Sequence, residues 1–286
     1  MERKKYRIGL VMKSLKADFF KVMQKGAEEF AASDGGFELI STGTDSQTEI
    51  DRQVALVDEL SASGVDALVV VPIDSKALVA PVVRAVRRGV KVVNIDIRLD
   101  ESLLSEAGVD VDFVGPDNFA AASEVGCLLA EKLEKGAPVA IIEGLPVADN
   151  ARQRKAGFDK AVAERGLDCK ESVPANWETH TAREVFGPIL AGHPEIKAVF
   201  CCNDAMALGV IDVLKEAGKK PGEIKVVGFD NDDVMRPLLD EGWLLGTVDA
   251  YGSQMAVEGI RHALSLLAGG QASLGNRPTP YTVIKR

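Results

Sequence analysis

The rest of the chain is organised around the stretch Tyr6–Phe20, YRIGLVMKSLKADFF. Its apolar run at residues 8–12 is typical of a strand that is buried on both faces of a parallel sheet. Apolar residues then recur three or four positions apart over residues 19–31, which predicts a helix with Asp18 as its N-cap. A buried strand followed by an amphipathic helix begins a βαβ unit. The polar turn at residues 13–17 lies at the carboxyl end of that strand, where ligands of open parallel sheets bind.

The same alternation continues along the chain of 286 residues. Further strands are expected at Phe37–Thr42, Asp66–Val71, Lys91–Asp96, Phe113–Gly115, Val139–Ile142, Lys170–Val173, Ala198–Cys202, Lys225–Phe229, Leu244–Val248 and Tyr281–Ile284. Helices are expected at Gln47–Ser63, Leu78–Arg88, Phe119–Leu133, Ala151–Glu164, Arg183–Ala191, Ala205–Ala217, Val234–Asp240 and Ser253–Leu267. This order predicts an α/β protein of two doubly wound, Rossmann-like lobes with parallel sheets.

The middle of the chain contains no Gly/Ser-rich or Pro-rich linker. We therefore expect the lobes to be joined by three crossings, near Asp117, Asp249 and Thr279, and not by one tether. The predicted N-terminal lobe comprises residues 1–116 and 250–278, and the predicted C-terminal lobe comprises residues 117–249 and 279–286.

The composition is that of an ordinary folded protein, and its charge narrows the choice of partners. The net charge of −9 argues against a nucleic acid or an anionic membrane, because no basic surplus is present to release counterions from phosphates. The cysteines Cys127, Cys169, Cys201 and Cys202 show no CxxC spacing, so neither a zinc site nor a disulfide framework is indicated. Cys201 and Cys202 are expected to be buried thiols, and we expect no metal and no cofactor.

The first residues, MERKKYRIGL, show a basic start but no apolar leader segment. No run of about 20 apolar residues occurs that could span a membrane. Taken alone, these features favour a cytoplasmic protein. The alternative is an exported protein in its mature form.

The common enzyme signatures of this fold class are missing, since no GxxxxGK[ST], GxGxxG after the first strand, GxSxG or HExxH occurs. His180, His193 and His262 fall in or just beyond predicted helices and are expected at the surface. Residues 230–233 (DNDD) lack the glycine and glutamate that a calcium loop requires. We expect a strand end and a helix start there, with Asp232 facing solvent from the helix.

Polar and aromatic side chains follow the carboxyl ends of the predicted strands. They are Lys13, Phe19, Phe20, Asp96, Arg98, Asn150, Arg154, Trp177, Asn203, Asp230 and Asp249. Such a mixture suits a carbohydrate, because charged and amide groups bind vicinal hydroxyls while aromatic faces cover C–H surfaces. Structural roles are open for each one: Asp96 and Asp230 as helix caps, Phe20 as core, and Arg154 as half of an ion pair.

Several segments carry a family resemblance over essentially the whole chain. They are VMKSLKADFF (11–20), VVNIDIRLDESLLSEAGVDVDFVGPDN (92–118), NARQRKAGF (150–158), AVFCCNDAMALG (198–209) and VVGFD (226–230). With these landmarks the chain resembles the type I periplasmic sugar-binding proteins of ABC transporters, in the ribose-binding group, and within it the D-allose-binding branch.

The resemblance implies a monomeric, periplasmic or lipid-anchored receptor without catalysis, whose hinge closes on one monosaccharide or polyol. It also implies a membrane permease as partner. Carried over position by position, the N-lobe wall would consist of Lys13, Phe19, Phe20 and Asp96, and the C-lobe wall of Arg154, Trp177, Asn203 and Asp230. Phe20 and Trp177 would be the stacking pair.

Two departures from the family pattern concern the ligand. Ribose-binding relatives carry Arg directly after the strand-end aspartate, whereas Ile97 follows Asp96 here and Arg98 comes one residue later, on the opposite side of an extended chain. This disfavours ribose. The usual Ala-Gln pair reads Asp249-Ala250, and the added carboxylate could accept from an extra hydroxyl or pair with an aminosugar. Lys13, shared with the allose-like branch, favours a neutral hexose or polyol.

Two other classes of protein remain as alternatives. The first is the sugar-effector domain of a lactose-repressor-type regulator, which has a similar fold. It is disfavoured because only five residues precede the first strand, too few for a helix-turn-helix. The second is a nucleotide- or phosphosugar-processing enzyme, which would need a phosphate loop or a poised base that the sequence does not show.

Overall fold

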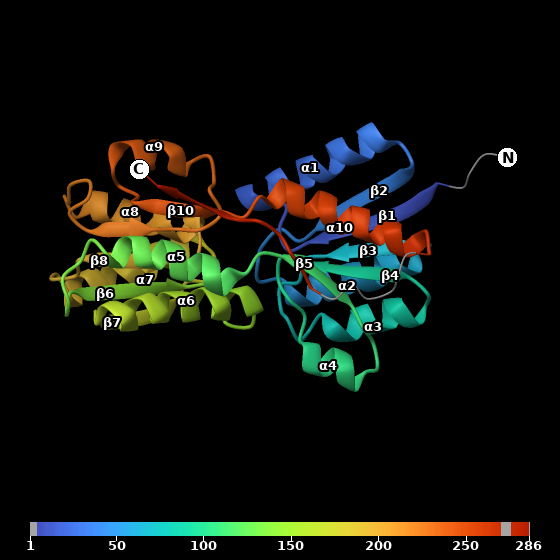
Figure 1. The fold of residues 1–286 in the computed structure, drawn as a ribbon, viewed down its shortest axis with the longest axis horizontal. Coiled ribbons are helices and arrows are strands. Elements are labelled where there is room, and N and C mark those ends of the chain that lie inside the picture. The colour runs from blue at the N-terminus through green and yellow to red at the C-terminus, as the bar shows by residue number, and fades with distance from the viewer. Residues whose placement is uncertain (1–4, 270–275, 286) are drawn as a thin grey trace. The chain divides into compact units, whose positions relative to one another are not determined.

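The computed structural model describes residues 5–269 and 276–285. The chain divides into two compact units. The first takes in Met1–Pro116, Val147–Asp149 and Tyr251–Thr279, and the second takes in Asp117–Pro146, Asn150–Ala250 and Pro280–Arg286. Figure 1 shows that each unit consists of a sheet with helices packed against it. In the described part of the chain, no helix is both long enough and apolar enough to cross a membrane.

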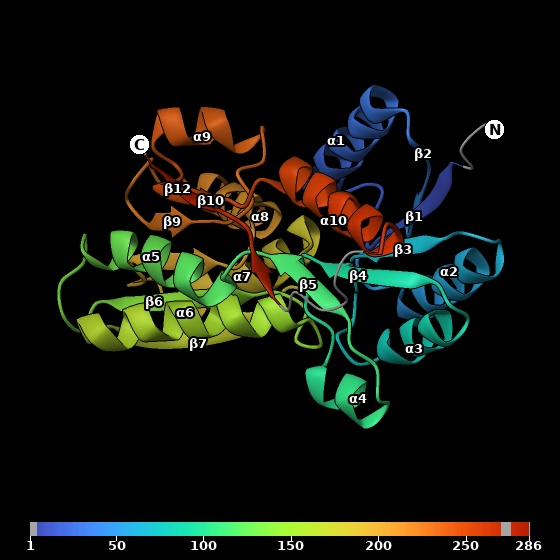
Figure 2. The ribbon, with the colours of Figure 1, turned by 45° about the vertical axis from the view of Figure 1, so that its right-hand side comes forward.

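The sheet of the first unit has the strand order β11-β5-β4-β3-β1-β2, with every pair parallel. Its strands are β1 (Tyr6–Met12), β2 (Phe37–Gly43), β3 (Ala67–Val70), β4 (Lys91–Ile95), β5 (Asp112–Gly115) and β11 (Arg277–Pro278). Its helices are α1 (Asp18–Asp34), α2 (Ile50–Ala62), α3 (Val79–Arg87), α4 (Glu101–Glu106) and α10 (Gly252–Leu267). Figure 2 shows α1 and α10 side by side.

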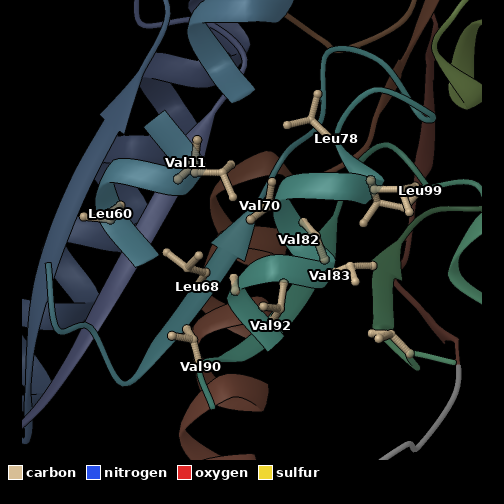
Figure 3. Packing of buried hydrophobic residues seen from close by; sticks show 14 of the residues in the cluster. Val11, Leu60, Leu68, Val70, Leu78, Val82, Val83, Val90, Val92 and Leu99 are labelled. Carbon is tan, nitrogen blue, oxygen red and sulfur yellow. The ribbon is translucent and has the colours of Figure 1, made fainter. Parts of the chain in front are cut away.

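The strand β3 of this sheet is apolar throughout because both of its faces are covered. Leu68 and Val70 belong to the core that α2 and α3 close, together with Val82 of α3 (Figure 3). Val69, between them in the sequence, faces the opposite side and packs against α10 at Gly259. Since successive strand residues point to opposite faces, a strand covered on both sides is a continuous apolar run.

The second unit repeats the plan with the strand order β12-β10-β9-β8-β6-β7. Its strands are β6 (Pro138–Glu143), β7 (Asp168–Pro174), β8 (Ala198–Cys201), β9 (Lys225–Val227), β10 (Gly246–Asp249) and β12 (Thr282–Lys285). Its helices are α5 (Asn118–Ala130), α6 (Asp149–Arg165), α7 (Thr179–Gly192), α8 (Asp204–Glu216) and α9 (Met235–Glu241). The prediction of two doubly wound α/β lobes is confirmed, except that β12 pairs antiparallel with β10.

Three local predictions are wrong. Ala17, not Asp18, is the N-cap of α1, and the Asp18 carboxylate instead pairs with Lys21 one turn later at 2.8 Å. The short helix α4 was not predicted; it begins after Asp100, whose side chain accepts from the Leu103 amide. The helix expected from residue 234 begins at Met235, so Asp232 lies in the turn before it.

His262 is buried, contrary to the prediction of a surface residue. It lies in α10 with 1% of its surface exposed, and its Nε2 is 2.6 Å from Oδ2 of Asp112 in β5. The burial follows from its position three residues after Gly259, on the face of α10 that packs against the sheet. Asp112, rather than water, is therefore the partner of Nε2. Cys201 and Cys202 are buried free thiols, as predicted.

Candidate functional site

In each unit the strand order changes direction at one strand, β1 or β6. The predicted site residues gather near the carboxyl end of the sheet at this point. β1 has β2 on one side and β3 on the other, and β6 has β7 and β8 as its neighbours. At such a strand, neighbouring connections run to opposite sides of the sheet and leave a crevice outside the carboxyl ends of the strands. Ligands of this fold class bind in that crevice. Lys13 follows β1 directly, and α6, which carries Arg154, follows β6.

In the first unit, Lys13, Phe19 and Phe20 form one group. Lys13 is only 4% exposed, and its Nζ lies 5.2 Å from the centroid of the Phe20 ring. The Phe19 and Phe20 rings meet edge to face with their centroids 5.2 Å apart. Asp96 follows β4 at the same edge of the sheet and is also buried. This edge therefore presents a cation, an aromatic face and a carboxylate, the groups that hydroxyls and C–H surfaces require.

Arg98 points away from this group, as its place in the sequence suggests. Its guanidinium carbon lies 4.2 Å from the centroid of the Phe113 ring, and Nη1 donates to Glu101 at 2.8 Å and also to Asn276. Ile97, next to Asp96, is fully buried. The Arg98 guanidinium is thus engaged by Phe113, Glu101 and Asn276 of its own unit.

In the second unit, Arg154 is the centre of the group. Its Nε donates to Asn118 Oδ1 and its Nη1 to the Cys202 carbonyl, both at 2.8 Å. Nη1 also donates to Asp230 Oδ1 at 3.2 Å, and the guanidinium carbon lies 3.5 Å from the centroid of the Phe229 ring. These partners fix a buried guanidinium, because a buried charge is tolerated only when it is paired and hydrogen-bonded.

Trp177 adds the aromatic face of this group. The Arg154 guanidinium carbon lies 5.6 Å from the centroid of the indole ring, and the side chain is 2% exposed. The ring packs on Gly144, where an added Cβ would lie 2.2 Å from the indole. Gly144, directly after β6, must therefore be a glycine for the Trp177 indole to pack in this position.

Asn203 and Asp249 have structural partners in the second unit. Asn203 is the N-cap of α8: its Oδ1 accepts from the Met206 amide at 2.9 Å, and its Nδ2 donates to the Trp177 carbonyl at 3.4 Å. Asp249 Oδ2 accepts from Asn231 Nδ2 at 3.0 Å. Asn203 therefore orients Trp177, and Asn231 orients the Asp249 carboxylate.

Neither of the two proposed cap residues is a cap. Asp100 caps α4 in place of Asp96, and Val234 takes the cap position of α9 in place of Asp230. Arg154, in contrast, is half of an ion pair, as considered from the sequence, and its partner is Asp230.

Three of the predicted ligand residues have a left-handed backbone. Asp96, Trp177 and Asp230 have φ values of 64°, 71° and 115°. Such a conformation costs a residue other than glycine about 1–3 kcal/mol, and it persists where surrounding contacts enforce it. Strain of this kind concentrates at binding sites, so its presence at three strand ends supports a functional role for these positions.

Two residues of the group were not predicted. Asn118, the first residue of α5, accepts a hydrogen bond from Arg154. One asparagine at the start of a helix is ordinary, so the sequence did not indicate this contact. Asp204 is fully buried next to the turn that carries Asp230, and an acidic residue in the first turn of a helix is ordinary. Burial raises the pKa of the Asp204 carboxyl well above its usual range, and the charges of Asp232 and Asp230 raise it further.

Comparisons with known proteins identify the family of the chain. Residues 8–271 match the family described as periplasmic binding protein domain. The chain is 43% identical over 266 residues to the D-ribose/D-allose-binding protein of Pseudomonas aeruginosa, covering 93% of this chain and 83% of that protein. It is 31% identical to the D-allose-binding periplasmic protein of Escherichia coli, over 88% of this chain and 81% of that protein.

Solved structures show the same fold. An ABC transporter solute-binding protein from Burkholderia multivorans superposes with a TM-score of 0.95 at 38% identity, covering 99% of this chain and 100% of that one. A periplasmic solute-binding protein from Actinobacillus succinogenes, with bound D-allose, superposes with a TM-score of 0.92 at 33% identity, covering 98% of both chains. The chain therefore belongs to the periplasmic binding protein family.

Proposed function

We propose that this chain is the solute-binding receptor of a monosaccharide ABC transporter, which binds one sugar and delivers it to the membrane permease in the periplasm. Family membership supports the class of protein, and the names of the relatives support a sugar ligand. In this proposal both units carry ligand residues. They are Lys13, Phe19, Phe20 and Asp96 in the first unit, and Arg154, Trp177, Asn203, Asp230 and Asp249 in the second.

The observation that carries the proposal is the Arg154, Asp230 and Trp177 group. The guanidinium is fixed by Asn118 and Cys202, so Asp230 is oriented before any ligand arrives. A carboxylate that accepts from two hydroxyls, beside a guanidinium that donates and an indole that covers C–H bonds, is complementary to a pyranose ring. Binding groups that are already fixed lose little conformational entropy when the sugar binds.

The relatives, together with Arg98 and Asp249, narrow the range of candidate sugars. One relative is a D-ribose/D-allose-binding protein, and another is a D-allose-binding protein. Arg98, which lies one position beyond the arginine of ribose-binding relatives, is engaged by Phe113 and Glu101. The Asp249 carboxylate, oriented by Asn231, offers an acceptor for an extra hydroxyl. We expect D-allose to bind more tightly than D-ribose, with polyols and aminosugars as the other ligand classes to test.

The function requires no catalysis. The family and the relatives are binding proteins, and the residues of the group are held in ion pairs and caps that suit binding. We therefore propose that the bound sugar leaves unchanged.

A thermal-shift screen tests the proposal directly. Aldohexoses, aldopentoses, polyols and aminosugars are added to the protein, and a sugar at about 100 times its dissociation constant should stabilise it by about 2.7 kcal/mol. Calorimetry then gives the affinity and stoichiometry of the best sugar, expected to be one per chain. A product detected after incubation would show an enzyme instead. No shift with any sugar would contradict the proposal.

A further inference from the structure

The turn that carries Asp230 is held by a buried carboxyl to which no role has been given. Asp204 is fully buried at the start of α8, and its amide donates to the Phe229 carbonyl at 2.7 Å. Its Oδ2 accepts from the Asp232 amide at 3.0 Å. The Thr247 hydroxyl lies 2.8 Å from Oδ1 and 3.0 Å from Oδ2 and donates to this carboxyl. Asp204 therefore binds the chain on both sides of Asp230.

Thr247 extends the same network along β10. Its Oγ1 accepts from the Asn231 amide at 3.3 Å, while the Asn231 side chain donates to Asp249. The Asp230 amide donates to the Val248 carbonyl at 2.7 Å. The two residues at the centre of the turn, Asp230 and Asn231, are thus tied to β10 through their backbone amides.

The conformation of the turn needs such restraint. Asp230 and Asn231 have φ values of 115° and 56°, which residues other than glycine rarely adopt. Gly228 is matched to the buried carboxyl, because a Cβ at this position would lie 2.0 Å from Asp204 Oδ1. The sequence thus has a glycine where the carboxyl approaches the backbone, and a hydroxyl that bridges this carboxyl to Asn231.

We propose that Asp204 and Thr247 are positioning residues for sugar binding, which hold Asp230 in the left-handed turn that presents its carboxylate to the ligand. The inference rests on the proposed function of Asp230 as a ligand acceptor. Burial raises the pKa of Asp204, which favours its neutral form.

The test is the affinity for D-allose and D-ribose, measured by calorimetry on the full chain. Thr247→Val removes the hydroxyl and keeps the shape, and it should weaken binding about tenfold, as the loss of one buried hydrogen bond does. Thr247→Ser keeps the hydroxyl and should bind within about threefold of the parent. Ser123→Ala is the matched control, since it removes another hydroxyl of the second unit, which accepts from Lys160 at 3.0 Å; it should bind within about twofold.

A double-mutant cycle separates positioning from a general structural effect. If Thr247 acts through Asp230, Thr247→Val should change the affinity little in an Asp230→Asn background. If the affinity losses of Thr247→Val and Asp230→Asn simply multiply in the double variant, the inference is overturned. Binding by Thr247→Val with the affinity of the parent would overturn it as well. If Thr247→Val does not fold, Gly228→Ala displaces the same carboxyl and should weaken binding in the same coupled way. A parent protein that binds no sugar would overturn the proposed function and this inference together, whereas a binding parent with uncoupled variants overturns the inference alone.

Discussion

Arg154 donates from Nη1 to Oδ1 of Asp230 across 3.2 Å, with side chains that are 3% and 10% exposed. The two residues are 76 positions apart in the sequence, on α6 and after β9. Asp230 is thus both the proposed ligand acceptor and the counter-ion of a buried guanidinium. Its replacement should affect sugar affinity and fold stability together.

Asp230→Ala should lower the affinity for the cognate sugar by about one to three powers of ten, because ligand hydroxyls lose a charged acceptor. It should also lower the free energy of unfolding by about 1–3 kcal/mol, since the Arg154 charge loses its counter-ion but keeps its hydrogen bonds to Asn118 and Cys202. Calorimetry and urea unfolding measure the two effects.

Asp233→Asn is the control for Asp230→Ala. Asp233 is exposed and lies in the same turn, so its replacement should change the affinity by less than about twofold. A loss of affinity in this variant comparable with that of Asp230→Ala would mean that any change in the turn suffices, and that Asp230 has no special role.

Trp177 should report sugar binding by its fluorescence. The chain has two tryptophans. The second, Trp243, follows α9, and its ring centroid lies 5.2 Å from Lys215 Nζ, outside the Arg154 group. In a Trp243→Phe variant, titration with the cognate sugar should shift the emission of Trp177, because its indole meets the ligand. A Trp177→Phe variant should lose the signal and bind more weakly. An equal signal from Trp243 alone would contradict the stacking role.

Asp204 gives a pH dependence that one substitution can isolate. Its folded-state pKa is raised by burial, so the folded protein holds a proton that the unfolded chain releases above about pH 4. The stability from this group is therefore complete at lower pH and is lost as the pH rises toward the folded-state pKa, by up to about 1.4 kcal/mol per pH unit. Because an asparagine side chain does not titrate, the Asp204→Asn variant does not lose this part of its free energy of unfolding as the pH rises. The melting temperature of the variant relative to the parent should rise from pH 4 to pH 8, and a constant difference would contradict a raised pKa.

The cysteines should differ sharply in reactivity. Burial raises the pKa of the Cys202 thiol to about 12 and that of Cys201 well above its usual range, whereas Cys169 is exposed. Because the thiolate is the reactive form, a thiol reagent at pH 8 should label Cys169 in the native protein and reach Cys201 and Cys202 only after denaturation. Mass spectrometry of labelled peptides checks this, and native labelling at Cys202 would contradict its burial.

Much of the fold is predictable from the sequence because parallel strands buried on both faces leave a plain signal. Ala67–Val70, for example, is a continuous apolar run and is fully buried as β3. The short helix α4 and the antiparallel pairing of β12 left no such signal. A helix of six residues has too little periodicity to detect, and the direction of an edge strand depends on where the chain returns to the sheet.

The sequence singles out candidate site residues, but not the contacts that they make with one another. Strand-end position singled out Arg154, Trp177 and Asp230, which the structure brings together in one unit. Their mutual contacts join segments far apart in the sequence, so no local pattern encodes them. The prediction that Asp232 faces solvent from a helix is wrong because Asp232 lies before α9 and is half-buried, where its amide donates to Asp204 Oδ2, 28 residues away.

Titration calorimetry of the parent protein with D-allose, beside Asp96→Asn and Asp230→Asn, tests the proposed sugar receptor function. We expect one sugar per chain, bound at least tenfold more weakly by each variant, because both carboxylates are proposed ligand acceptors. Binding that depends on Asp230 but not on Asp96 would confine the site to the second unit. The absence of binding for D-allose, D-ribose and the other monosaccharides of the screen would contradict a sugar receptor.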